Sequence, residues 1–292
     1  MKNIILTGSS SGFGRITAQV LAKEGYHVFA TMRNPKSKNQ LIATYLSEWA
    51  LSNRLMLTVV ELDVTDEDSV ANAMAEIAEA TNGQIDVLIN NAGIGYIGLN
   101  ETLSAAQVDW MFQVNVVGAD RMIKAALPYM HERKEGLIIN VSTIASRMPI
   151  PNMGIFSATK AALEALTISY YYELASVGIG IALIQPGTFP STNIIANQLE
   201  PANPRAEAYY GEEMGNIRRA LLESYIPGPF KPECIEVAYA IRNVIGVPSP
   251  FRSLWTIVRG GFKEQSVRYF NQATRELVDS FLEVTGVVYD AE

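Results

Sequence analysis

The sequence predicts an α/β fold, in which a doubly wound parallel β-sheet is flanked by helices within a single domain. Short, continuous apolar runs recur along the chain, as expected for strands that are buried on both faces. Segments with apolar residues at helical spacing separate these runs, and repeated strand–helix units form parallel sheets with right-handed crossovers. The 292 residues contain no internal repeat and no sign of a second domain, so we expect one domain over 1–292.

The strand–helix alternation starts at the first residues of the chain. Strands are predicted, in order, at Asn3–Thr7, His27–Thr31, Leu55–Leu62, Ile85–Ile89, Leu137–Val141 and Ile179–Ile184. Helices are predicted over Gly14–Glu24, from Thr65 onward and over Phe156–Ala175. Thr65 and Asp68 have the spacing of a capping box, which places the start of the second of these helices at Thr65.

The stretch 190–232 departs from this alternation. It is rich in proline and holds a helical segment near Glu212–Glu223. Because a segment of this length after a sheet strand is more often a lid or binding loop than a linker, we predict a substrate lid over 190–232. Beyond it we predict a helix over 233–247, a short strand near Trp255–Val258 and a C-terminal helical extension over 260–292.

Composition argues against several classes of function. The formal net charge of −7 argues against nucleic-acid binding, because contacts to phosphates need a basic patch. One cysteine, Cys234, and two distant histidines, His27 and His131, predict neither a disulfide framework nor a metal site. No apolar run reaches the roughly 18 residues of a membrane span, and the first one is too short for a signal-peptide core. We therefore expect a cytoplasmic protein.

A glycine-rich turn follows the first predicted strand, in the sequence Thr7-Gly8-Ser9-Ser10-Ser11-Gly12-Phe13-Gly14. Glycines let such a turn bring its backbone close to a pyrophosphate, and the N-terminus of the following helix stabilises the negative charge. An ordinary glycine-rich connection would have the same composition, so the interpretation depends on motifs elsewhere in the chain.

Those further motifs follow in order. Asn90-Asn91-Ala92-Gly93 comes after the fourth predicted strand, Asn115 lies in a helix, Lys160 lies near the start of the next helix, and Pro186-Gly187 follows the sixth strand. With Gly8-x-x-x-Gly12-x-Gly14, this series resembles the short-chain dehydrogenase/reductase family, whose fold is a Rossmann-type doubly wound sheet. The general likeness is to its hydroxysteroid and retinol dehydrogenase-like branch.

The resemblance implies that the turn and the loops at the ends of the strands bind a nicotinamide dinucleotide. The residues that it implies in this binding are Gly8, Ser10, Ser11, Gly12, Phe13, Gly14, Asp63, Val64, Asn91, Ala92, Gly93, Lys160, Pro186, Gly187, Thr188 and Phe189. Within this set, Asp63 and Val64 would contact adenine, and Asn91 would brace the ribose. The loop Pro186–Phe189, with Thr192, would hold the nicotinamide carboxamide.

The choice between NAD and NADP depends on the end of the second strand. An NAD-selective site places a carboxylate there, which accepts hydrogen bonds from the ribose 2′-hydroxyl and would repel a 2′-phosphate. Here the position holds Met32, and Arg33 follows it. A guanidinium can bind a phosphate through two parallel hydrogen bonds, although an arginine in a solvated loop would look the same in sequence. We expect NADP(H) as the cofactor, with Arg33 at its 2′-phosphate.

The catalytic set that the resemblance implies has one gap. Family members that reduce ketones or oxidise alcohols use a tyrosine four residues before the lysine as the proton donor or acceptor. In this chain the lysine is Lys160, and Phe156 stands at the tyrosine position. Phenylalanine fills the space of the ring but has no proton to give. Thr143 occupies the position of the hydroxyl that polarises the substrate oxygen, and Asn115 that of the asparagine that holds a water in the proton relay.

Two explanations of Phe156 remain open, an engineered exchange of the tyrosine and a natural protein that lacks the phenol. Three functions are correspondingly open. The first is an NADP(H)-dependent carbonyl reductase or alcohol dehydrogenase, impaired by Phe156. The second is a non-redox enzyme on the same scaffold, and the third is an NADP-binding sensor or interaction protein without turnover.

Apolar residues in the predicted lid, together with Met148, Ile150 and Met153, favour an apolar ketone or secondary alcohol as the substrate. The resemblance also implies a homodimer or homotetramer. The helices around Trp110–Leu127 and Phe156–Ala175 would pair across its two-fold axis.

Overall fold

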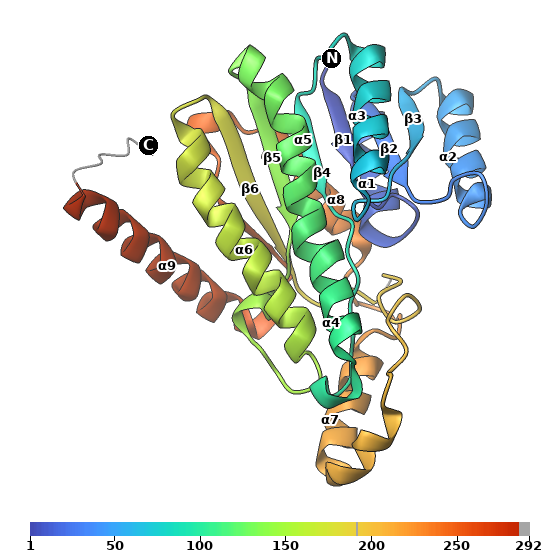
Figure 1. Ribbon diagram of the computed structural model, residues 1–292, viewed down its shortest axis with the longest axis vertical. Helices are drawn as coiled ribbons and strands as arrows, with labels where there is room; N and C mark the ends of the chain where they lie inside the picture. Colours follow the sequence, from blue (N-terminus) through green and yellow to red (C-terminus); the bar gives the residue numbers. More distant parts are fainter. Residues whose placement is uncertain (191, 286–292) are drawn as a thin grey trace.

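Seven parallel strands form one sheet in the order β3-β2-β1-β4-β5-β6-β7 (Figure 1). This computed structural model describes residues 1–190 and 192–285. The strands are β1 (Asn3–Leu6), β2 (His27–Met32), β3 (Leu57–Glu61), β4 (Val87–Asn90), β5 (Gly136–Val141), β6 (Ile179–Pro186) and β7 (Trp255–Val258). The strand order reverses between β1 and β4, and ligands of doubly wound sheets bind at such a reversal. The predicted fold class is confirmed.

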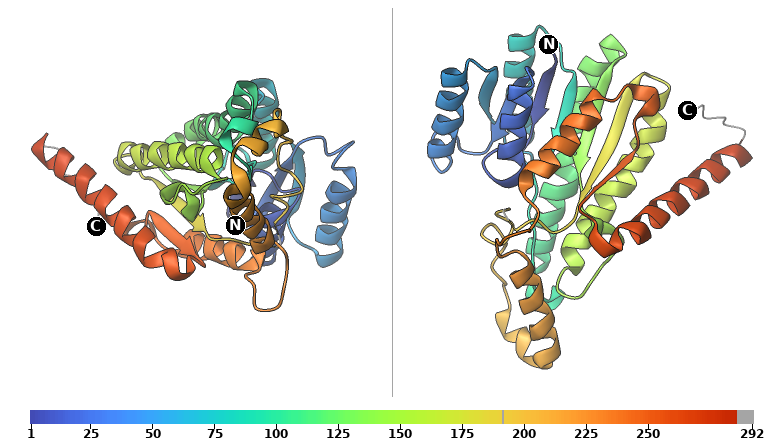
Figure 2. Two further views of the ribbon diagram at one scale, coloured as in Figure 1. Left: turned by 90° about the horizontal axis from the view of Figure 1, so that it is seen from below. Right: turned by 180° about the vertical axis from the view of Figure 1, so that it is seen from behind.

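Helices cover both faces of this sheet (Figures 1 and 2). The α-helices of the described ranges are α1 (Gly12–Lys23), α2 (Gln40–Asn53), α3 (Glu67–Thr81), α4 (Ala105–Phe112), α5 (Gly118–Arg133), α6 (Gly154–Ala175), α7 (Gly211–Ser224), α8 (Cys234–Gly246) and α9 (Glu264–Val284), and α7 lies beyond the end of the sheet. Successive residues of a strand face opposite sides of the sheet. Ile4 and Leu6 therefore pack in a core with α1 and α8, whereas Ile5 packs in a second core with α3, α5 and α6.

The predicted start of the helix after the third strand is wrong. The helix α3 begins at Glu67, and its N-cap is Asp66, whose carboxylate accepts a 3.0 Å hydrogen bond from the Ser69 amide. Thr65 lies before the cap and binds Asp63 instead, to which its hydroxyl and its amide donate at 2.7 and 2.9 Å. The helix α2 had no counterpart among the predicted elements.

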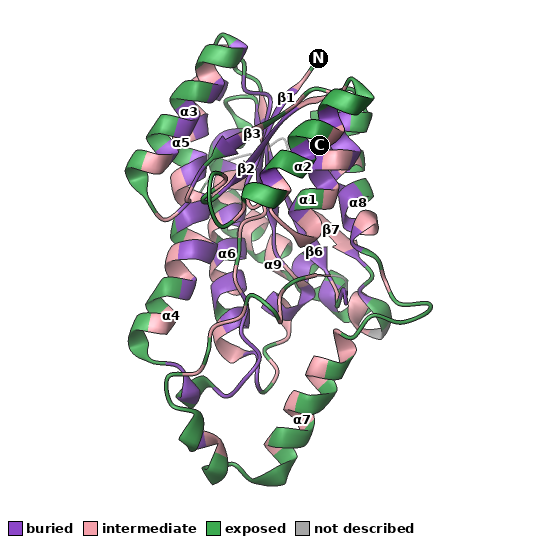
Figure 3. Ribbon diagram, turned by 90° about the vertical axis from the view of Figure 1, so that its right-hand side faces the viewer, coloured by how far each residue is buried: buried purple, intermediate pink, exposed green. Residues whose placement is uncertain are grey.

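The segment predicted as a lid forms its own projection beyond the end of the sheet. It contains a 3-10 turn (Pro204–Tyr209) and α7. Figure 3 shows the buried strands inside the molecule and α7 largely exposed at the opposite end from the N-terminus. None of the residues of α7 is fully buried. None of the helices in the described ranges has the length and apolar character needed to cross a membrane.

A buried carboxylate joins α6 to the segment after β5. Glu164, on α6, is fully buried, and its Oε1 accepts hydrogen bonds from the hydroxyls of Ser142 and Ser146, each 2.6 Å long. Its other oxygen pairs with Nη2 of Arg147 at 3.0 Å. Buried charges are tolerated when they are paired and hydrogen-bonded in this way.

The same cluster is one of the contacts that hold α9 against α6 and the sheet (Figures 1 and 2). Asn271, a buried residue of α9, accepts a 3.1 Å hydrogen bond from Nε of Arg147 and donates a 2.7 Å bond to Gln185 at the end of β6. Gln185 in turn donates to Glu164 at 3.0 Å. The ion pair Arg147–Glu164 thus connects the sheet, α6 and α9.

Replacing Arg147 with methionine should therefore destabilise the protein markedly. The exchange leaves the Glu164 carboxylate buried without its cation, and loss of one partner of a buried pair costs about 3–5 kcal/mol. The measurement is the free energy of unfolding in urea. Arg268→Met is the control, because Arg268 forms an exposed ion pair with Glu264 on α9, and such pairs contribute about 1 kcal/mol or less. Equal losses in the two variants would contradict this account of the cluster.

Candidate active site

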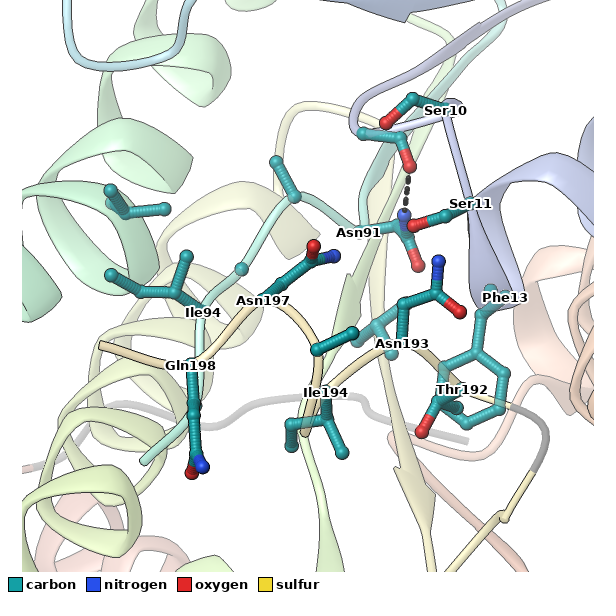
Figure 4. A pocket seen from close by; sticks show the side chains of 18 of the residues that line it. Ser10, Ser11, Phe13, Asn91, Ile94, Thr192, Asn193, Ile194, Asn197 and Gln198 are labelled. Carbon is teal, nitrogen blue, oxygen red and sulfur yellow. Dashed lines mark hydrogen bonds between the residues drawn. The ribbon is translucent and has the colours of Figure 1, made fainter. Parts of the chain in front are cut away.

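A cavity of about 590 Å³ opens where the strand order reverses, at the carboxyl ends of the strands. The sequence-predicted residues that line it are Gly8, Ser10, Ser11, Gly12, Phe13, Arg33, Asp63, Val64, Asn91, Ala92, Gly93, Thr143, Phe156, Lys160, Pro186, Gly187 and Phe189. Gly14, Asn115 and Thr188 are not part of its wall. Figure 4 shows Ser10, Ser11 and Asn91 on one side of this cavity and Ile94 and Gln198 farther along it.

The glycine turn presents a helix N-terminus without a side-chain cap to the cavity. The N-cap of α1, Ser11, makes no side-chain capping bond, and the first turn of α1 contains no acidic residue. The amides and the positive end of the helix dipole are therefore available to an anion. Gly8 has φ +73°, and a Cβ there would lie 2.8 Å from Cα of Ala92. The turn could not pass this close to the β4 loop with a side chain at residue 8.

Asn91 fastens the turn to the end of β4. Its side-chain amide donates to the carbonyl oxygens of Thr7 and Gly8, at 2.8 and 3.1 Å. Its backbone amide donates to the Thr7 hydroxyl at 3.0 Å. The Asn91 side chain thus has a structural task in this chain, in addition to the ribose contact that the family resemblance implies.

The far end of the cavity carries two cations. Arg33 is half exposed, and its Nη1 lies 3.8 Å from Oδ2 of Asp63. The loop that follows β2 turns back, so that Lys38 and Asn39 also line the cavity. Asn39 holds this loop by donating a 2.6 Å hydrogen bond to the Arg33 carbonyl oxygen. Sequence reasoning missed Lys38, because nothing in a local pattern shows that the loop returns to the cavity.

Lys160 lies at the centre of the cavity wall with its side chain buried. Its ammonium donates a 2.9 Å hydrogen bond to the carbonyl oxygen of Val141, at the end of β5. Burial lowers the pKa of Lys160 to about 8, and the negative charge of Glu164, one turn further along α6, partly opposes this effect. The ammonium form therefore predominates below pH 8 and loses its proton above it.

Asn115 lies behind this wall, in a π-helical turn (Gln113–Val117) between α4 and α5. Its side chain both accepts from the Ile94 amide and donates to the Ile94 carbonyl oxygen, each at 2.8 Å. A Cβ on Gly93 would lie 3.2 Å from the Asn115 Oδ1 and 3.5 Å from the Lys160 Nζ. Single π-turns inside helices are frequent at functional sites, and here one brings Asn115 next to Lys160 across Gly93.

Thr143 and Phe156 complete the predicted catalytic set. The Thr143 hydroxyl accepts from the Ala145 amide at 3.2 Å and donates to the Pro186 carbonyl oxygen at 3.1 Å. Phe156 is only 7% exposed and belongs to an apolar cluster with Met153. Of the predicted catalytic residues, Thr143, Phe156 and Lys160 line the cavity and Asn115 lies behind its wall. Phe156 contributes an apolar side chain where a phenol would be a proton donor.

A second, smaller cavity of about 40 Å³ adjoins the first. Its apolar lining residues are Ile144, Ala145, Met148, Ile150, Met153 and Leu221. Thr143, Gly187 and Tyr225 line both cavities. Tyr225 follows α7 in the lid, and no motif in the sequence singled it out. In the described ranges, no group of three His, Cys, Asp or Glu residues is placed to hold a metal ion.

Comparison with known proteins agrees with this geometry. The short chain dehydrogenase family model matches residues 2–202. A 3-ketodihydrosphingosine reductase from Bacteroides thetaiotaomicron is 40% identical over 186 residues, which make up 64% of this chain and 63% of that protein, less than two thirds of its length. Retinol dehydrogenase 8 from Homo sapiens is 37% identical over 288 residues, 96% of this chain and 86% of that protein.

Solved structures give the same result. A short-chain dehydrogenase from Streptomyces avermitilis is 28% identical with a TM-score of 0.74, covering 98% of this chain and 97% of its own. An alcohol dehydrogenase from Thermococcus sibiricus, complexed with 5-hydroxy-NADP, is 25% identical with a TM-score of 0.69, covering 88% of this chain and 96% of its own. Because the family match extends over the strands β1 to β6, whose ends form the cavity, this chain belongs to the short chain dehydrogenase family of oxidoreductases.

Proposed function

We propose that the protein is an NADP(H)-dependent oxidoreductase that acts on an apolar ketone or the corresponding secondary alcohol. One observation carries the proposal. A single cavity joins an uncapped helix N-terminus and two cations at one end to Lys160 and Thr143 at the other. A dinucleotide needs anion sites at a distance from the place where its nicotinamide reacts, and this cavity offers both.

The residues present fit a nicotinamide dinucleotide. The turn Gly8–Gly14 would hold the pyrophosphate, since its free amides meet no competing side chain. Asp63 and Val64 would border the adenine, and Pro186, Gly187 and Phe189 would border the nicotinamide. When bound, the nicotinamide exchanges a hydride with the substrate carbon. Lys160 would bind the ribose hydroxyls through those ammonium protons that Val141 does not use.

The preference for NADP(H) rests on the two cations beside the end of β2. Arg33 and Lys38 both line the cavity where the 2′-phosphate of the adenosine would lie. The Arg33 guanidinium is 3.8 Å from Asp63, and a phosphate would offer it a stronger, bidentate partner. The end of β2 itself carries Met32, which neither repels a phosphate nor binds a ribose hydroxyl.

Removing these cations should weaken binding of NADPH much more than binding of NADH. Hydrogen bonds to charged groups contribute about 1.5–3 kcal/mol each, so Arg33→Ala should raise the dissociation constant for NADPH by about tenfold to a hundredfold. Lys38→Ala should have a smaller effect of the same kind. The measurement is calorimetric titration with both nucleotides. Lys36→Ala, in the same loop but outside the cavity wall, is the control. An equal loss for NADH and NADPH would reject the preference for NADP(H).

The substrate class follows from the apolar side of the site. One part of the smaller cavity's wall is apolar, with Met148, Ile150 and Met153, and Ile194 and Leu222 from the predicted lid pack with Phe156 in one apolar cluster. The names of the relatives, a ketodihydrosphingosine reductase and a retinol dehydrogenase, point to long apolar molecules. We therefore take 3-ketodihydrosphingosine as the probe for reduction and the secondary alcohol formed from it as the probe for oxidation.

Phe156→Tyr should raise the rate of ketone reduction by at least about a hundredfold, because a positioned general acid contributes roughly 10²–10⁴ in rate. The new phenol would lie on α6, one turn before Lys160. The positive charge of Lys160 lowers the pKa of a neighbouring phenol. The assay follows NADPH absorbance with 3-ketodihydrosphingosine. Phe270→Tyr, a half-exposed position on α9, is the control for a phenol added elsewhere. No gain with a substrate that demonstrably binds would contradict the assignment of this site.

Phe156 itself favours a second candidate, an enzyme on this scaffold whose reaction needs no phenol. Consumption of a substrate without any change in NADPH absorbance would favour this candidate. An NADP-binding protein without turnover would bind the nucleotide and consume neither probe.

We also propose that copies of the chain pair through α4, α5 and α6. Trp110 on α4 and Val117 in the π-helical turn are apolar and each 37% exposed in a single chain, which supports a covered face there.

A further inference from the structure

The site lacks an obvious source for the proton that a substrate oxygen needs. Phe156 has no proton to donate. Thr143 has one, but it donates that proton to the Pro186 carbonyl oxygen at 3.1 Å. The remaining ammonium near the centre, Lys160, is bound to the Val141 carbonyl oxygen behind the wall. Another hydroxyl at the cavity wall could supply this proton.

Tyr225 stands out because of where it lies. It lines the large cavity together with Lys160 and Phe156, and it lines the smaller cavity together with Met148 and Met153. Thr143 and Tyr225 are the two side-chain hydroxyls that border both spaces. A substrate oxygen at the boundary between these cavities would face both of them. Among the described residues of the two walls, Tyr225 is the only tyrosine.

The surroundings of Tyr225 prepare its phenol for donation. The Tyr225 phenol shares a hydrogen bond with the Thr188 hydroxyl, and this bond favours the phenolate that remains after the phenol has donated its proton. Thr188 lies two residues after Pro186, whose carbonyl oxygen accepts from Thr143. The loop after β6 therefore forms hydrogen bonds with both hydroxyls, with Thr143 through Pro186 and with Tyr225 through Thr188.

The geometry points to Tyr225 as the catalytic residue that donates a proton to the substrate oxygen, in place of the phenol absent at position 156. This inference rests on the proposed function. In ketone reduction a bound reduced nicotinamide would supply a hydride to the carbonyl carbon, and the electron pair of the broken carbonyl π bond would move to the oxygen. That oxygen takes the Tyr225 proton, and the phenolate regains a proton from solvent water. In alcohol oxidation the same groups act in reverse.

The protonation state of Tyr225 suits this role. Burial raises the pKa of Tyr225 above its ordinary value near 10, and the bond with Thr188 opposes this only in part. The phenol is thus protonated at neutral pH. The charged side chains that line the same cavities are Arg33, Lys38 and Asp63 at the distant adenosine end, and Lys160 and Lys263 nearer to Tyr225. Because the phenol is a weaker acid than one beside Lys160, turnover should be slower than in Phe156→Tyr.

The first test removes the phenol proton in two backgrounds. Tyr225→Phe should lower kcat for 3-ketodihydrosphingosine reduction by about a hundredfold, and leave the affinity for NADPH unchanged. In the Phe156→Tyr background the same exchange should lower kcat by less than about fivefold, because the restored phenol supplies the proton. Tyr209→Phe is the matched control, since Tyr209 lies in the same lid but is 85% exposed.

A pH profile separates Tyr225 from a water held by Lys160. If Lys160 supplied the proton, the reduction rate would fall as the pH rises through about 8, where the ammonium loses its proton. With Tyr225 as the donor, the rate should persist until the pH passes the raised pKa of the phenol, above 10. A loss centred near pH 8 would overturn the inference.

Binding without turnover gives an independent measurement. The ketone cannot be reduced in a complex with NADP⁺, so calorimetry there reports its affinity alone. Tyr225→Phe should weaken ketone binding by about two- to tenfold, the range for one hydrogen bond, and Tyr209→Phe should not.

The outcomes distinguish this inference from the proposed function. If Phe156→Tyr reduces the ketone while Tyr225→Phe changes neither kcat nor ketone affinity of the parent chain, the function stands and the role of Tyr225 is rejected. The role of Tyr225 would also be rejected if Phe156→Tyr were active while the parent chain showed no turnover. No turnover in any variant would reject both.

Discussion

The close packing of the glycine turn against the end of β4 is the constraint on which the site depends. Thr7 accepts hydrogen bonds from the backbone amides of both Asn91 and Ala92, and Asn91 returns two bonds to the turn. These bonds join β1 and β4 at the reversal of the strand order. They hold the N-terminus of α1 open towards the cavity and set the β4 loop opposite it. A bulkier residue than Gly8 would separate the two.

Much of this arrangement could be predicted because the signals are local. Buried parallel strands are short apolar runs, and the glycine turn, Lys160 and the Pro186-Gly187 break each stand next to the end of a strand or the start of a helix. The ends of parallel strands meet at one edge of a sheet, so residues far apart in sequence could be assigned to one site. The start of α3 was missed because a second capping residue follows directly after Thr65. Asp66, not Thr65, accepts the hydrogen bond that caps this helix.

Other parts of the site could not be predicted, because they depend on the path by which a loop leads back to the cavity. Lys38 reaches the cavity only because Asn39 ties its loop to the Arg33 carbonyl oxygen. Tyr225 reaches it only because the lid folds back over the loop after β6. Neither position has a periodicity or a motif that marks it. The cluster of Glu164, Arg147 and Asn271 could not be predicted from the sequence either, because it joins α6 to α9, more than a hundred residues later in the chain.

The position of Tyr225 changes what the lid has to do. A phenol at position 156 would stand on α6, which is held by the buried Glu164 cluster and is fixed whether or not a substrate is present. Tyr225 instead follows α7, a helix without a fully buried residue, and segments with little buried surface open more easily than the core. If Tyr225 donates the proton, as we propose, donation depends on the position of this predicted lid, and an apolar substrate packed against Leu221 in the smaller cavity would stabilise it. A substrate whose apolar part binds at this cavity would hold Tyr225 in place beside Thr143. Binding of the apolar part would thereby be coupled to proton transfer.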